Sequence, residues 1–127
     1  MLKVQREISL LKPEMIRMAK LAQHICNSYE LPFEIFETLR DIDRQTQLVN
    51  DGKSKTIHSK HLTGEAFDMV LRNPDWSWIY KGNEKLWYSL GYLLPFYAKK
   101  YYGYNIRWGG DWGWDFPHFE WLDMKKR

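Results

Sequence analysis

Hydrophobic positions recur at helical spacing in two parts of the chain. In the first, Pro13–Ser28, an apolar residue returns every three or four positions, and Pro13 suits a first helical turn. A second helix is predicted to begin after Asn83, which can cap it, but Pro95 is expected to kink or interrupt that helix. The apolar positions of this second helix are Leu86, Trp87, Leu90, Leu93 and Leu94.

Shorter patterns predict strands. Residues 32–39 alternate between two faces, with Phe33, Ile35 and Glu37 on one of them, which predicts a strand that ends at Arg40. Further segments rich in apolar residues predict strands over residues 66–71, 106–108 and 117–122, and residues 73–75 (Asn-Pro-Asp) predict a turn. Helices alternating with such short strands predict an α+β domain, in which helices pack on a small, mainly antiparallel sheet.

A short helix and a long loop are predicted between the first two strands. Asp41 or Asp43 can cap the helix, and the Asp-Gly pair at residues 51–52 can stop it. Residues 52–64 are polar and follow neither the helical nor the strand period, so they are expected to form a loop.

The composition limits the class of protein. A chain of 127 residues has the length of a single domain, so one domain over residues 1–127 is expected. It is 44% hydrophobic and contains seven Trp, which excludes disorder. The net charge of +3 comes from dispersed basic residues, which does not favour nucleic-acid binding, and the short basic run at residues 125–127 is expected to be a solvated tail.

Cysteine usage and hydropathy indicate where the protein is made. Cys26 is the only cysteine, so an internal disulfide is impossible, and its place on the apolar stripe of a helix predicts a buried thiol. Residues 1–12 lack the apolar stretch of a signal peptide, and no segment approaches the ~20 apolar residues of a membrane span. We therefore expect a monomer made in the cytoplasm, without a signal peptide and without a membrane partner.

Histidine and carboxylate groups occur in three separate segments. The polar loop carries His58 and His61, the second strand carries Asp68, and the last strand carries His118. Two imidazoles and one carboxylate can hold zinc and leave a fourth position open, as catalysis requires. Asp68 in an apolar strand would be costly to bury unpaired, so a metal ion or an arginine is its expected partner. Spacing alone leaves His58 as an alternative ligand and His118 as a possible core histidine.

Three segments carry a resemblance to a known family. The sequence SKHLTGEAFD at residues 59–68 resembles the SxHxxGxAxD motif of the zinc family of D-alanyl-D-alanine carboxypeptidases and L-alanyl-D-glutamate endopeptidases, which includes VanX- and VanY-type enzymes. The sequence DFPH at residues 115–118 resembles the second element of that family in its phage-type form, and WGGDW at residues 108–112 resembles a further segment of the phage enzymes. Upstream of these three segments, the sequence ETLR at residues 37–40, followed by Gln45 and Leu48, resembles the strand-end arginine and the following helix of the family. The resemblance therefore covers roughly residues 33–121.

The resemblance implies a role for each matching residue. Zinc would be bound by His61, Asp68 and His118, while Asp115 would act as general base and then as general acid. Arg40 would steady the scissile carbonyl, with a structural salt bridge as the alternative. Four further residues are candidates for binding substrate, bracing the loop, orienting a ligand or lining a cleft: Ser59, Gln45, Glu120 and Trp112.

The function implied by the resemblance is hydrolysis of peptidoglycan stem peptides at a zinc cleft on one face of the sheet. The phage-type motifs favour an L-alanyl-D-glutamate endopeptidase, made as a phage or prophage endolysin and released to the cell wall by a separate protein. One alternative is a D-Ala-D-Ala carboxypeptidase or dipeptidase of the same family, and another is a zinc-binding module without catalysis. An iron oxygenase is disfavoured because Asp68 lies seven residues after His61, whereas those sites use an HxD spacing.

Overall fold

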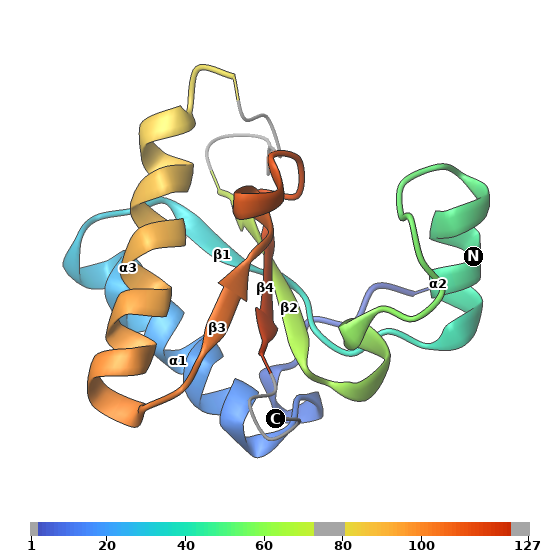
Figure 1. The fold of residues 1–127 in the computed structure, drawn as a ribbon, viewed down its shortest axis with the longest axis horizontal. Coiled ribbons are helices and arrows are strands. Elements are labelled where there is room, and N and C mark those ends of the chain that lie inside the picture. The colour runs from blue at the N-terminus through green and yellow to red at the C-terminus, as the bar shows by residue number, and fades with distance from the viewer. Residues whose placement is uncertain (1–2, 73–80, 123–127) are drawn as a thin grey trace.

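The fold is an α+β arrangement of three helices and one sheet. The computed structural model describes residues 3–72 and 81–122, and the turn expected at residues 73–75 and the basic tail at residues 125–127 lie outside these ranges. The described strands are β1 (Phe33–Glu37), β2 (Ala66–Leu71), β3 (Ile106–Trp108) and β4 (His118–Trp121). They form a sheet of order β1-β2-β4-β3 in which every neighbouring pair is antiparallel (Figure 1). This confirms the predicted fold class.

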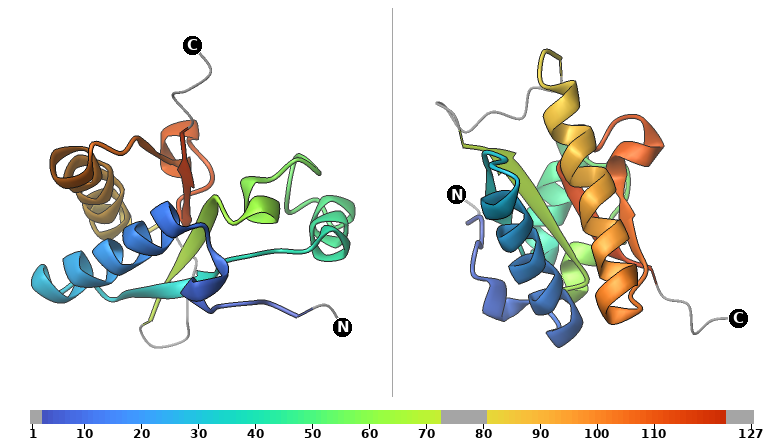
Figure 2. Two further views of the ribbon diagram at one scale, coloured as in Figure 1. Left: turned by 90° about the horizontal axis from the view of Figure 1, so that it is seen from below. Right: turned by 90° about the vertical axis from the view of Figure 1, so that its left-hand side faces the viewer.

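Two helices cover one face of the sheet and the third lies on the other side. Helices α1 (Pro13–Ser28) and α3 (Glu84–Tyr102) pack against each other and against the sheet, as both views in Figure 2 show. Helix α2 (Ile42–Asn50) stands on the opposite side of the sheet (Figure 1). Asp41 caps α2 by accepting a hydrogen bond of 2.8 Å from the backbone N–H of Arg44, as predicted.

The hydrophobic core lies between the sheet and the pair formed by α1 and α3. Phe67 of β2 and Phe119 of β4 are fully buried there and stack with their ring centroids 5.9 Å apart. Cys26 is buried in this core, as predicted. Within the described ranges, no helix has the length and hydrophobicity needed to cross a membrane. The described residues also contain three 3-10 turns: η1 (Ile8–Leu10), η2 (Lys60–Thr63) and η3 (Gly109–Trp112).

Helix α3 continues through Pro95, so of the two effects expected of this proline, a kink or an interruption, the interruption does not occur. A proline inside a helix removes one hydrogen bond and costs about 3 kcal/mol. Leu90, Leu94 and Ala98 are all fully buried, on both sides of the proline. Burying a leucine side chain contributes about 1.5–3 kcal/mol, so the continuous apolar stripe outweighs the loss caused by the proline.

Strand β1 contains an irregularity that corrects the predicted side of Glu37. Ile35 pairs with Met69, but Glu37 pairs with Asp68, so the register shifts by one residue between the two positions. Such a bulge changes the face on which the following side chain lies. Simple alternation would place Glu37 on the core face with Ile35; the shift places it on the face of Asp68.

Candidate metal centre

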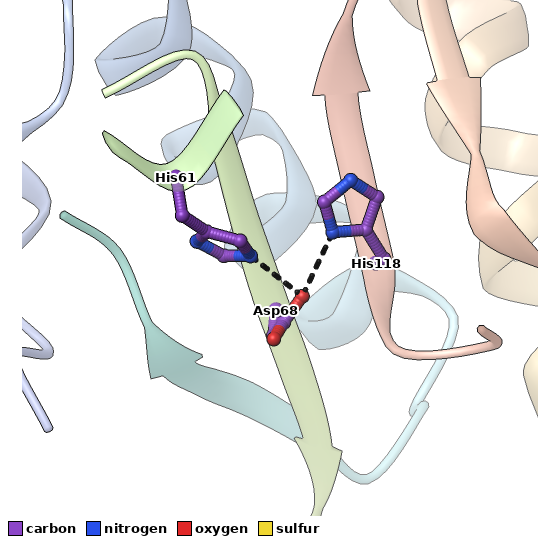
Figure 3. A group of neighbouring side chains, drawn as sticks. All are labelled: His61, Asp68 and His118. Carbon is purple, nitrogen blue, oxygen red and sulfur yellow. Dashed lines mark hydrogen bonds and ion pairs between the residues drawn. The ribbon is translucent and has the colours of Figure 1, made fainter. Parts of the chain in front are cut away.

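Three side chains from three elements meet on the sheet face opposite α1 and α3. Asp68 of β2 and His118 of β4 are direct partners in the antiparallel register, and His61 reaches them from the η2 turn. His61 Nε2 lies 3.1 Å and His118 Nδ1 lies 3.2 Å from Asp68 Oδ1. Figure 3 shows both imidazoles turned toward this carboxylate. One ligand atom from each residue lies within 4.8 Å of the other two, so the group could hold a metal ion.

The second nitrogen of each imidazole is already committed to an acceptor. His61 Nδ1 lies 2.8 Å from the carbonyl oxygen of Thr38, and His118 Nε2 lies 2.8 Å from Oε1 of Glu120. A carbonyl oxygen and a carboxylate accept hydrogen bonds, so these nitrogens carry the protons and donate. In neutral imidazoles the other nitrogens would then present lone pairs to the oxygen of Asp68. A bound cation stabilises such an arrangement, and metal-ligating histidines are commonly oriented in this way.

The close approach of Asp68 and the two imidazoles shifts the pKa values of Asp68 and His118 in the metal-free chain. Burial alone would raise the pKa of Asp68, but the interaction with His61 and the hydrogen bonds with both imidazoles hold it well below its usual range. Burial opposes a charged imidazole at His118, yet its hydrogen bonds with Asp68 and Glu120 raise its pKa to about 10. A metal ion entering this group must therefore displace a proton from His118.

Glu37 and Asp68 would repel each other without the guanidinium of Arg40, which lies beside both carboxylates. They are cross-strand partners, and like charges in such pairs are destabilising. Arg40 places one terminal nitrogen 2.7 Å from Glu37 Oε1 and 3.5 Å from Asp68 Oδ2, so a single guanidinium faces both carboxylates. Arg44 pairs with the other oxygen of Glu37 at 2.5 Å. Burial would raise the pKa of Glu37, but the hydrogen bonds from Arg44 and Arg40 keep it below its ordinary value.

Arg40 is buried with most of its donors in use. Its second terminal nitrogen donates to Oε1 of Gln45 at 2.7 Å, and only 7% of its side chain is exposed. Its Nε is buried and has no hydrogen-bond partner among the residues that the structure describes. The salt bridges expected of Arg40 are therefore present, and its role at the scissile carbonyl stays a prediction.

Asp115 lies at the edge of the candidate centre. Its Oδ2 is 4.0 Å from His118 Nδ1, the nitrogen that faces Asp68. Burial and the negative charge of Asp68 raise the pKa of Asp115 to about 6 in the metal-free chain. A carboxyl group with a pKa near neutrality can both accept and return a proton, which is the requirement for general acid–base catalysis.

The backbone at Gly109 lies close to both Asp115 and His118. A Cβ atom on Gly109 would lie 2.9 Å from the Cβ of Asp115 and 3.0 Å from the Cβ of His118. A larger residue would therefore push both side chains out of place. This explains in physical terms why a glycine stands at that position of the WGGDW segment.

The other predicted site residues lie around the centre. Ser59 caps the η2 turn, with its Oγ accepting from the backbone N–H of His61 at 3.1 Å. Gln45 donates to Ser54 Oγ at 2.8 Å, which ties the long loop to α2. Trp112 is 38% exposed and its ring lies 5.5 Å from that of His118.

The remaining histidines and several unpredicted residues complete the description. His58 and His24 are exposed and lie outside the candidate centre. Sequence reasoning missed Glu37 and Arg44, and it missed the role of the Thr38 carbonyl. The position of a charged residue at the end of a predicted strand could have pointed to Glu37. The bulge that turns Glu37 toward Asp68 cannot be recognised from the alternation of apolar and polar residues in the sequence.

Comparisons with known proteins show the family of the chain. Residues 3–121 match the family described as phage L-alanyl-D-glutamate peptidase. The L-alanyl-D-glutamate peptidase of Listeria phage A118 is 33% identical over 91 residues, which cover 68% of this chain and 29% of that protein. The match therefore spans less than a third of that relative's length.

Solved structures share the fold. The L-Ala D-Glu endopeptidase ChiX of Serratia marcescens superposes with a TM-score of 0.74 at 29% identity, covering 96% of this chain and 90% of that one. The LD-carboxypeptidase LdcB gives a TM-score of 0.59 at 17% identity, with coverages of 98% and 65%. The vancomycin resistance D,D-dipeptidase VanXYg gives 0.54 at 18% identity, with coverages of 98% and 57%. The last two likenesses show the fold alone.

Proposed function

The chain belongs to the phage L-alanyl-D-glutamate peptidase family, and from this premise we propose that it is a zinc peptidase acting on peptidoglycan stem peptides. The bond it would hydrolyse joins L-alanine to D-glutamate. The observation that carries the proposal is the convergence of His61 Nε2 and His118 Nδ1 on Asp68, with the opposite nitrogen of each imidazole engaged by an acceptor. Two imidazoles and one carboxylate are a donor set found in catalytic zinc sites.

The roles of the residues follow from their places. Zinc, when bound by His61, Asp68 and His118, would supply a Lewis acid that polarises the scissile carbonyl and lowers the pKa of water. Asp115, with its oxygen at the edge of the centre, would accept the proton of the attacking water and return it to the leaving amine. Arg40, whose guanidinium faces Asp68, would keep positive charge beside the developing negative charge on the carbonyl oxygen.

The supporting residues would hold this geometry. Glu120 would fix the ring of His118 through the hydrogen bond to Nε2, and the backbone at Thr38 would do the same for His61. Gln45 and Ser59 would brace the loop that carries His61, and Trp112 would form one wall of the substrate cleft. The substrate would be the stem peptide of the cell wall, which a monomer made in the cytoplasm would reach after release.

Digestion of intact peptidoglycan tests the proposal. Two samples of purified protein, one loaded with zinc and one treated with chelator, are incubated with the polymer. The products are identified by mass spectrometry. We expect stem peptides with a free N-terminal D-glutamate, produced only with zinc present. Release of terminal D-alanine instead would make the chain a carboxypeptidase. A zinc-loaded protein that releases no fragment would refute the peptidase assignment and leave a non-catalytic zinc-binding module.

A further inference from the structure

A lysine is connected to the candidate metal centre through two aromatic rings. Lys55 places its ammonium 4.5 Å from the ring centroid of Trp114. The ring of Trp114 lies 5.8 Å from that of Trp112, which in turn lies 5.5 Å from the ring of His118. The long loop that follows α2 therefore meets the segment that follows η3, and Trp112 joins this contact to His118 of the candidate centre.

The loop is anchored on both sides of Lys55. The amide nitrogen of Gln45 donates to Ser54 Oγ at 2.8 Å and to the carbonyl oxygen of Thr56 at 2.6 Å. The amide oxygen of Gln45 accepts from Arg40 at 2.7 Å. One side chain of α2 thus links the residues that flank Lys55 to the guanidinium beside Asp68. The position of Lys55 relative to the centre is set by these bonds.

The charge of Lys55 is not matched by a carboxylate. Lys55 is exposed, and it forms no ion pair with any residue in the described parts of the chain. Contact with an aromatic face holds the ammonium only weakly at an exposed site and leaves its three N–H donors available. An exposed ammonium held in this way is suited to bind an anionic group of a ligand.

We propose that Lys55 binds a carboxylate of the stem peptide on the amine side of the scissile bond. This inference rests on the proposed function and names a feature of the substrate for the same site. Two groups on that side have the required chemistry: the free α-carboxylate of D-glutamate, and the side-chain carboxylate of a diamino acid at the next position. In both cases Lys55 selects the acid over the corresponding amide.

Three synthetic peptides distinguish the two carboxylates. The first contains L-Ala-γ-D-Glu followed by L-Lys, the second has the α-carboxylate of the glutamate converted to an amide, and the third combines that amide with diaminopimelate in place of L-Lys. Wild-type protein is expected to cleave the acid at least about tenfold more efficiently than the amide, chiefly through a lower KM. This difference would assign the contact to the α-carboxylate of D-glutamate, whereas equal cleavage of the first two peptides with a gain of about tenfold for the third would assign it to the diamino acid.

Variants at position 55 show whether the lysine is responsible. Lys55→Met should lower kcat/KM for the acid to the value for the amide and leave the amide unchanged, whereas Lys55→Arg should keep the preference. Lys53→Met is the matched control, because Lys53 is an exposed lysine of the same loop, and it should behave as wild type. A loss that affects acid and amide equally would show that Lys55 only stabilises the loop, and would overturn the inference.

Binding measurements separate this inference from the proposed function. Calorimetric Kd values for the same peptides and zinc-loaded variants report the preference for the acid without cleavage. If no peptide is cleaved but wild type still binds the acid at least about tenfold more tightly and Lys55→Met does not, the peptidase assignment fails and the carboxylate contact stands. If peptides are cleaved and Lys55→Met keeps the wild-type preference, the carboxylate contact fails and the peptidase assignment stands.

Discussion

Replacing Asp115 by asparagine tests the proposed chemistry most directly, because the change removes a titratable group and keeps the size of the side chain. Asp115 is not one of the three residues whose ligand atoms converge, so zinc should remain near stoichiometric in the variant. Asparagine cannot accept a proton at neutral pH. General acid–base groups contribute about 10²- to 10⁴-fold in rate, which corresponds to ~3–5 kcal/mol of barrier, so peptide hydrolysis should fall by at least the lower bound.

The same substitution should stabilise the metal-free protein. The pKa of Asp115 rises from 3.8 to about 6 on folding, so the folded state disfavours the carboxylate. The stability associated with the neutral acid is fully present below pH 3.8 and is lost as the pH rises through 6. The rise corresponds to roughly 3 kcal/mol, and solvent screening of a side chain that is 28% exposed reduces this to about 1–2 kcal/mol. Asparagine avoids this cost.

Two assays on the same preparations check both consequences. Hydrolysis of wall peptides is measured on zinc-loaded wild type and on Asp115→Asn, together with zinc content. Thermal unfolding is measured with chelator at pH 7.5, where the variant should be more stable, and at pH 4, where the advantage should largely disappear. A variant that cleaves at the wild-type rate would refute the proton-transfer role. A variant that is less stable than wild type at pH 7.5 would contradict the electrostatic account of Asp115.

Three further substitutions or treatments have defined outcomes. His61→Ala should lose bound zinc while His58→Ala keeps it, because only His61 lies in the candidate centre; equal zinc content after dialysis would mean that the ligand is misassigned. Arg40→Lys should keep zinc and lose about 10²-fold in turnover, since an ammonium cannot reproduce the planar fork of donors, and unchanged kinetics would leave Arg40 with a structural role. Burial raises the pKa of the Cys26 thiol to about 11, so a thiol reagent at pH 8 should label it only after denaturation, and rapid labelling of the native protein would contradict its burial.

Most of the fold could be predicted because local patterns and tertiary packing agree. The bounds of α1 follow from Pro13 and from the apolar stripe, and the bounds of β2 follow from a run of apolar residues. At Pro95 the expected interruption does not occur, because burial of apolar side chains on both sides of the proline outweighs the rule for an isolated helix. A local pattern cannot report how much apolar surface a distant element will cover.

The candidate site was predictable to the extent that its residues stand in short motifs. His61, Asp68 and His118 were named from motifs, and the structure brings these three together. The network of Glu37 and Arg44 was not predicted, because it depends on a register shift in β1 and on a tertiary contact between Glu37 of β1 and Arg44 of α2. The contact between Lys55 and Trp114 joins residues far apart in the sequence, and nothing in either segment indicates the other.

The direct pairing of Asp68 with His118 makes metal affinity a measure of correct strand alignment. A slip of one residue between β2 and β4 would turn one of the two side chains toward the hydrophobic core, and the pair of ligands would be lost. A metal ion that binds only the correctly aligned sheet stabilises that state by mass action. Zinc should therefore lower the population of misaligned strand pairings during folding. The zinc concentration during expression should therefore affect the yield of native protein as well as its activity.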